Sequence, residues 1–146
     1  MKAINAYDID RLNEVLLKSE KTAIITHAKP DGDAAGSSTA LYHFLKAYGT
    51  AELKIVLNDR FQPVLEFLAD EGLADNICIY SDNEKAAADA IEKADTIVCL
   101  DFNAFHRTDT LEQVLADSKA EKVLIDVKGL YKISELEASG MKYWRL

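Results

Sequence analysis

The feature that most constrains the fold of this chain is an alternation of short apolar runs with longer amphipathic segments. The apolar runs are residues 22–26, 52–58, 76–80, 95–101 and 122–126. Strands that are apolar on both faces and separated by helices indicate βαβ units and a sheet covered on both sides. We therefore expect an α/β fold, with a doubly wound parallel sheet of about five strands and helices on both faces.

The segments between the apolar runs carry the predicted helices. Residues 8–19 place four apolar side chains on one stripe, the spacing of an amphipathic helix: Leu12, Val15, Leu16 and Leu17. Further helices are predicted at 36–48, from Pro63 onward, at 82–93 and at 108–117.

The pattern changes after residue 126. Residues 127–146 contain one possible helical turn, at 134–138, and end in an apolar stretch with Tyr143 and Trp144. We expect an α/β domain over residues 1–126 and a divergent C-terminal tail over 127–146. The apolar end of this tail either covers an edge of the sheet or forms half of a homodimer interface.

Composition and charge exclude several classes of protein. The chain has 146 residues, about one domain, and a net charge of −8, which argues against binding of duplex nucleic acid through its backbone. No apolar run approaches the ~20 residues that span a bilayer, and acidic residues interrupt the start of the chain, so we expect no membrane segment and no signal peptide. Cys78 and Cys99 lie in apolar runs, which is typical of buried thiols in a reducing cytoplasm.

Acidic residues follow several of the predicted strands. Asp101 and Asp126 close the fourth and fifth runs, and parallel strands bring such ends to one edge of the sheet. An isolated aspartate after a strand is often only a helix cap. Asp59 and Asp82 also follow strands, and no pattern marks them as functional.

The segment after the first run, HAKPDGDAAGSS, is different. It combines His27 with Asp31 and Asp33, and carboxylates this close repel one another unless a cation compensates. Histidine with carboxylates forms a mixed N/O donor set suited to Mn²⁺, Zn²⁺ or Fe²⁺. Gly36 and Ser37 are expected to begin the next helix, whose free N–H groups and dipole offer a site for phosphate. The segment therefore predicts metal-assisted phosphate chemistry.

These residues resemble a known family. The segment ITHAKPDGDAAGSSTAL (25–41) resembles the first motif of the DHH phosphoesterases, the superfamily of RecJ exonuclease, nanoRNase/pAp phosphatase and cyclic-dinucleotide phosphodiesterases. VCLDFNAFHRT (98–108) resembles the second motif, and VLID (123–126) the entry to the third. The PDGDA-GSS form of the first motif is most similar to the nanoRNase/pAp-phosphatase type.

The resemblance implies a hydrolase with two Mn²⁺ ions that cleaves phosphodiester or phosphomonoester bonds of a small nucleotide or short oligonucleotide. His27 and Asp31 would ligate one ion and Asp33 the second, while Asp101 would bridge both. Asp126 is a further implied ligand, and Asp33 and Asp101 are the implied catalytic residues. The implied substrate contacts are Gly36, Ser37 and Arg107.

The sequence also departs from the family pattern. Asp126 is followed by Val127 and Lys128 rather than by two histidines. We also expect no counterpart, within these 146 residues, of the C-terminal domain that binds substrate in the family. We therefore expect weak binding of the second ion and low or no activity. The alternative is a non-catalytic binding or assembly domain of DHH ancestry.

The same pattern also bears on two unrelated functions. A receiver-like phospho-acceptor domain would use Asp101 as the acceptor and Lys128 as the lysine that follows the fifth strand. A Rossmann dinucleotide site is excluded because no G-x-G-x-x-G follows the first strand.

Overall fold

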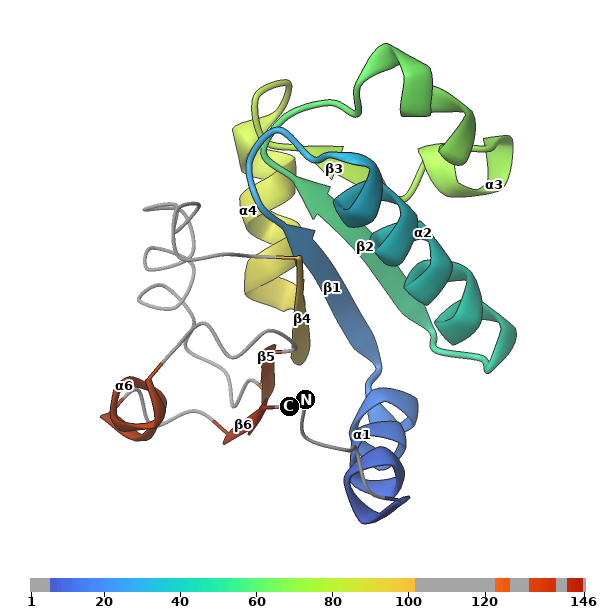
Figure 1. Ribbon diagram of the computed structural model, residues 1–146. Coiled ribbons are helices and arrows are strands. Elements are labelled where there is room, and N and C mark those ends of the chain that lie inside the picture. The colour runs from blue at the N-terminus through green and yellow to red at the C-terminus, as the bar shows by residue number, and fades with distance from the viewer. Residues whose placement is uncertain (1–5, 102–122, 127–131, 139–141, 146) are drawn as a thin grey trace.

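The parallel sheet predicted from the apolar runs forms the centre of the protein (Figure 1). The computed structural model describes residues 6–101, 123–126, 132–138 and 142–145. The strands are β1 (Lys21–Thr26), β2 (Glu52–Leu57), β3 (Ile77–Ile79), β4 (Thr96–Leu100), β5 (Val123–Asp126) and β6 (Lys142–Arg145). All neighbouring strands run parallel, which confirms the α/β fold.

Helices connect the strands much as the sequence predicts. They are α1 (Ala6–Lys18), α2 (Gly32–Ala47), the 3₁₀ helix η1 (Pro63–Leu68), α3 (Glu71–Ala74), α4 (Glu84–Lys93) and α6 (Ile133–Ala138). The helix predicted at 108–117 lies outside the described residues. Within the described part of the chain, no helix has both the length and the apolar character needed to cross a membrane.

The strand order shows where a ligand is expected to bind. The sheet runs β3-β2-β1-β4-β5-β6, so the direction of winding reverses between β1 and β4. Open α/β sheets bind ligands at the carboxyl ends of the strands beside such a reversal. A receiver domain instead has the order 2-1-3-4-5, so the receiver-like interpretation is wrong for this chain.

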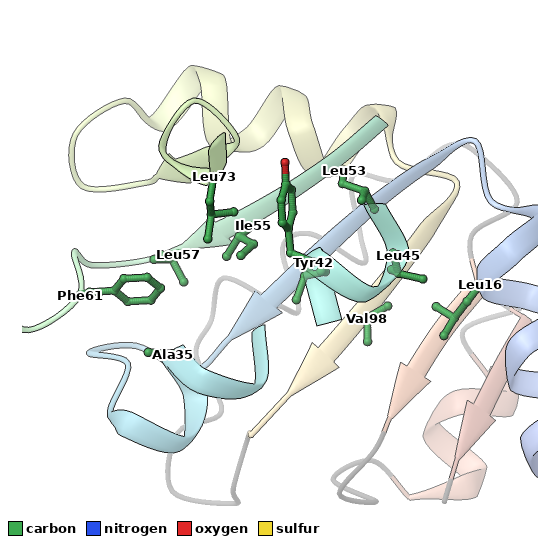
Figure 2. Close-up of a cluster of buried hydrophobic side chains, with 11 residues drawn as sticks. Leu16, Ala35, Tyr42, Leu45, Leu53, Ile55, Leu57, Phe61, Leu73 and Val98 are labelled. Atoms are coloured by element: carbon green, nitrogen blue, oxygen red, sulfur yellow. The ribbon is translucent and has the colours of Figure 1, made fainter. Parts of the chain in front are cut away.

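Two hydrophobic clusters lie on opposite faces of the sheet because successive side chains of a strand alternate between faces. In β1, Ile24 belongs to one cluster, whereas Ala23 and Ile25 belong to the other. The first cluster joins the sheet to α2 through Tyr42 and Leu45 (Figure 2). The second packs α4 against the opposite face. Burial of one large aliphatic side chain contributes roughly 1.5–3 kcal/mol, so the first cluster fixes α2 firmly over the sheet.

The amino ends of β1 and β4 are joined by a hydrogen-bond network around Asp95. The Ser19 hydroxyl donates to Asp95 Oδ1 at 2.5 Å, and it lies 2.7 Å from the Thr22 hydroxyl. The N–H groups of Glu20 and Lys21 donate to Asp95 Oδ2 at 2.9 and 3.0 Å. Asp95 therefore holds the start of one central strand to the start of the other.

The start of α2 differs from the prediction. The helix begins at Gly32 rather than Gly36, because Asp31 caps it: Asp31 Oδ1 accepts from the N–H groups of Asp33 and Ala34, each at 3.1 Å. Aspartate is among the best N-cap residues, and Gly36 is accommodated inside the helix. The positive end of the helix therefore lies at Asp31 itself.

The end of the chain also adds to the sheet. Lys142–Arg145 form β6, which pairs parallel with β5 and extends the sheet beyond the five strands that we expected. The division of the chain at residue 126 stays a prediction. Of the two thiols, Cys99 is buried as expected, whereas Cys78 is only partly buried.

Candidate metal centre

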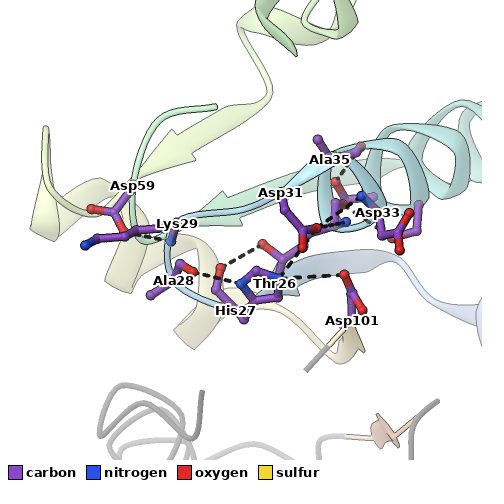
Figure 3. Close-up of polar contacts among 12 residues, drawn as sticks. Thr26, His27, Ala28, Lys29, Asp31, Asp33, Ala35, Asp59 and Asp101 are labelled. Carbon is purple, nitrogen blue, oxygen red and sulfur yellow. Dashed lines mark hydrogen bonds and ion pairs between the residues drawn. The ribbon is translucent and has the colours of Figure 1, made fainter. Parts of the chain in front are cut away.

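Three side chains from the two central strand ends meet at the carboxyl edge of the sheet (Figure 3). His27 directly follows β1, Asp31 caps α2, and Asp101 directly follows β4. One ligand atom from each of the three lies within 4.8 Å of the others. Since β1 and β4 flank the reversal of winding, the cluster occupies the expected binding position of this fold.

The local structure of His27 fixes which ring nitrogen faces the cluster. Nδ1 lies 2.8 Å from the carbonyl oxygen of Ala28, and a carbonyl only accepts hydrogen bonds, so Nδ1 carries the proton. In the neutral form of the ring, Nε2 is therefore the nitrogen without a proton. This atom lies 3.8 Å from Asp31 Oδ1 and 3.6 Å from Asp101 Oδ2. The side chain of His27 is only 6% exposed, so its lone pair is aimed in a fixed direction.

Asp31 is both the cap of α2 and a member of the cluster. The N–H of Ala34, which donates to Oδ1, lowers the pKa of Asp31 most; burial acts in the opposite direction, and the N–H of Asp33 lowers the pKa further. The positive end of the α2 dipole also favours the carboxylate. Asp31 is therefore held as an anion at neutral pH, in the form that binds a cation.

Asp101 reaches the cluster through an unusual backbone conformation. Its φ is 56°, in the left-handed region that few residues other than glycine adopt, although aspartate tolerates it. Its side chain is 13% exposed. The left-handed turn ends β4 and places the carboxylate beside His27 (Figure 3).

The chemistry of this donor set fits a divalent cation. An unprotonated imidazole nitrogen and two carboxylates are all electron-pair donors. Bringing the two carboxylates together costs electrostatic free energy, which a bound cation offsets. One nitrogen with carboxylate oxygens suits Mn²⁺, Zn²⁺ or Fe²⁺ better than Ca²⁺ or Mg²⁺, which prefer oxygen alone. The hydrogen bond from Nδ1 to a backbone carbonyl is also the usual support of a metal-binding histidine.

The remaining predicted residues occupy different positions. Asp33 lies in the first turn of α2, exposed, and its carboxylate is not part of the three-residue cluster. Gly36 and Ser37 lie further along α2, where the Ser37 hydroxyl donates to the Ala34 carbonyl at 3.3 Å. The free N–H groups that we expected at Gly36 and Ser37 are therefore not at a helix start, and their contact with substrate stays a prediction.

Two predicted residues can be placed only in part. Asp126 ends β5 and lies opposite Cys99 of β4 in the sheet register, so its backbone is at the carboxyl edge next to the strand that carries Asp101. Arg107 lies outside the described residues. Their proposed roles, as a metal ligand and a substrate contact, stay predictions.

The structure adds one acid that the sequence did not mark. Asp59, which follows β2, accepts the N–H of Lys29 at 2.9 Å, within the loop between His27 and Asp31. Lys29 has a φ of 52°. The sequence offers no pattern from which to predict this hydrogen bond, because its acceptor is a side chain thirty residues away from the backbone N–H that donates.

Comparison with known proteins decides the family. The model of the DHH family, N-terminal domain, matches residues 21–137. This chain belongs to the DHH family. Members of this family are phosphoesterases that typically depend on metal ions, and the cluster of His27, Asp31 and Asp101 is a group of the DHH domain that could bind one.

A solved structure is similar to almost the whole chain. It is the crystal structure of an exopolyphosphatase-related protein from Bacteroides fragilis, with 32% sequence identity and a TM-score of 0.71. The match covers 99% of this chain but 40% of that protein, so this DHH domain spans well under half of its length. No curated protein matches the chain.

Proposed function

We propose that this chain is the catalytic domain of a Mn²⁺-dependent phosphoesterase that hydrolyses phosphodiester or phosphomonoester bonds of small nucleotides, such as pAp or a short oligoribonucleotide. The observation that carries the proposal is the meeting of His27, Asp31 and Asp101 within 4.8 Å at the reversal point of the sheet. Membership of the DHH family, whose substrates are of the nucleotide type, supports the same chemistry.

In this proposal the three residues together bind a single ion. His27 supplies Nε2 because its Nδ1 proton is bound to the Ala28 carbonyl. Asp31 and Asp101 supply the negative charge that holds a divalent cation. A bound Mn²⁺ would polarise a phosphoryl oxygen and lower the pKa of water, so that water becomes a nucleophile at neutral pH.

Residues around the cluster would orient the substrate. The positive end of α2 lies at Asp31, and a helix N-terminus favours a phosphate group beside it. Asp33 in the first turn of α2 and Asp126 at the end of β5 are the proposed additional ligands, of a second ion. Because Val127 and Lys128 follow Asp126, we propose that this second ion is held weakly and that turnover is slow.

The first test measures metal binding directly. Titration of the full chain with MnCl₂ in a calorimeter is expected to show one tight site in the wild type, which is lost in Asp101→Ala. Asp82→Ala is the matched control, because Asp82 follows β3 at the same edge of the sheet and pairs with Arg60 at 2.7 Å, outside the cluster. Equal Mn²⁺ binding in all three proteins, or none in the wild type, would refute the site.

The second test separates a slow enzyme from a non-catalytic domain. The family motif has two histidines where this chain has Val127 and Lys128, and this difference favours the non-catalytic alternative. Release of phosphate from pAp, and cleavage of a diribonucleotide, are measured with Mn²⁺ for the wild type and for His27→Ala. Turnover clearly above that of His27→Ala supports the enzyme; identical rates, with Mn²⁺ bound, support the binding domain.

A further inference from the structure

The peptide group that joins Ala28 to Lys29 is held at both of its ends. Its carbonyl oxygen accepts the proton of His27 Nδ1, with the atoms 2.8 Å apart. Its N–H donates to Asp59 Oδ2 at 2.9 Å (Figure 3). Asp59 is therefore connected to the imidazole of His27 through one peptide group.

Asp59 is itself fixed in place. The side-chain amide of Asn58 donates to the same oxygen, Asp59 Oδ2, at 2.9 Å. This hydrogen bond lowers the pKa of Asp59, the N–H of Lys29 lowers it further, and burial opposes both. A carboxylate at the end of β2 is thus kept ionised and aimed at the loop that follows the neighbouring strand, β1.

The backbone of Lys29 requires such an anchor. Its φ of 52° lies in the left-handed region, which side-chain-bearing residues seldom adopt. Lys29 also precedes Pro30, and a residue before proline prefers extended backbone. A conformation that is unfavourable on both counts persists only where surrounding contacts enforce it, and the hydrogen bond to Asp59 is such a contact.

We propose that Asp59 is a positioning residue of the metal centre. It holds the Ala28–Lys29 peptide in the orientation that keeps the proton of His27 on Nδ1. As a consequence, Nε2 stays unprotonated and faces the two carboxylates of the cluster. The charge of Asp59 also polarises the peptide and so strengthens the carbonyl as an acceptor. The inference rests on the proposed metal site, but its structural part can be tested without metal.

The decisive experiment reads the tautomer of His27 in the metal-free full chain. Imidazole ¹⁵N shifts from NMR, at a pH where the ring is neutral, distinguish a proton on Nδ1 from one on Nε2. The wild type and Asp82→Asn are expected to show a proton on Nδ1 alone. Asp59→Ala is expected to show both tautomers. Asp59→Asn, which keeps the shape but loses the charge, is expected to lie in between and replaces Asp59→Ala if that variant does not fold.

Mn²⁺ affinity supplies the second readout. Loss of a group that positions a metal-binding histidine typically lowers the affinity for the metal about 10–100-fold. Asp59→Ala should therefore bind Mn²⁺ about 10–100-fold more weakly than Asp82→Asn. A folded Asp59 variant with the proton still on Nδ1 alone overturns the inference, even if Mn²⁺ binds. A changed tautomer in a chain whose wild type binds no Mn²⁺ supports the positioning role and refutes the proposed function instead.

Discussion

Strand β4 has an aspartate at each end, and the two lie in different surroundings. Asp95, before the strand, accepts hydrogen bonds from a hydroxyl and two backbone N–H groups. Asp101, after the strand, has a left-handed backbone, and its Oδ2 lies 3.6 Å from Nε2 of His27. At the amino edge the carboxylate faces hydrogen-bond donors, whereas at the carboxyl edge it lies beside His27 and Asp31, the two other possible ligands of a cation.

This difference separates a carboxylate that stabilises the fold from one that belongs to the candidate metal centre. Donors around Asp95 compensate its charge within the protein, so the amino edge is complete in itself. The carboxyl edge instead assembles like groups, which costs folding free energy that a bound cation can return. Functional sites often carry such a cost, which the rest of the structure must offset.

The largest expected effect comes from breaking the amino edge. Asp95→Ala removes three hydrogen bonds to a charged acceptor and should lower the free energy of unfolding by about 2–3 kcal/mol. Urea denaturation measures this loss. Asp101→Asn, the counterpart at the other edge, should leave the stability of the metal-free protein unchanged or slightly higher, because asparagine tolerates positive φ and carries no charge. A larger loss in Asp101→Asn than in Asp95→Ala would contradict the distinction.

An effect of similar size is expected when metal binds at the carboxyl edge. A ligand at 100 times its Kd stabilises the folded state by about 2.7 kcal/mol. Mn²⁺ at that concentration should therefore raise the Tm of the wild type and of Asp95→Ala, measured by circular dichroism. The same concentration should leave the Tm of Asp101→Asn almost unchanged. A similar rise in Asp101→Asn would show that the ion binds elsewhere.

The smallest effect concerns Asp59 and depends on pH. Its folded-state pKa is lowered, first by the Asn58 amide, below the value of about 3.9 in the unfolded chain. Its contribution to stability is therefore present above the unfolded pKa and lost as the pH falls through the folded pKa. The difference in unfolding free energy between wild type and Asp59→Asn should narrow as the pH falls from about 6 to about 3. Asp82→Asn serves as the reference for the loss of one acidic side chain at this edge of the sheet. A difference in unfolding free energy that widens as the pH falls would contradict the lowered pKa of Asp59.

Much of the fold follows from local sequence patterns. Continuous apolar runs such as the one that contains Ile24 predict buried parallel strands, because both faces must be covered. The order of the strands does not follow from such patterns, because it depends on which crossovers pack best over the whole sheet. The last strand, β6, was missed because four residues with two aromatics fit an edge strand and an interface equally well.

The cluster of His27, Asp31 and Asp101 could be predicted in part, because two of its members belong to one local sequence pattern. His27 and Asp31 stand close in the sequence, and Asp101 joins them through the general rule for the ends of parallel strands. The start of α2 was misplaced because the glycine and serines at 36–38 resemble a helix start, although Asp31 carries the stronger capping signal. Asp59 was missed because its partner is a backbone N–H, which every residue except proline possesses.

The two hydrophobic clusters share no side chain, since the sheet separates them. Of these two clusters of described residues, the one with Leu45 anchors α2 and, through it, the cap residue Asp31. Substitutions beneath α4, such as Ile91→Val, should therefore combine additively with changes on the other face and leave the ligand atoms where they are. Residues of the α4 layer can therefore change in evolution, or be redesigned to carry a tether or a reporter, with little effect on the metal centre. Residues of the opposite layer must preserve the packing of α2 against the sheet.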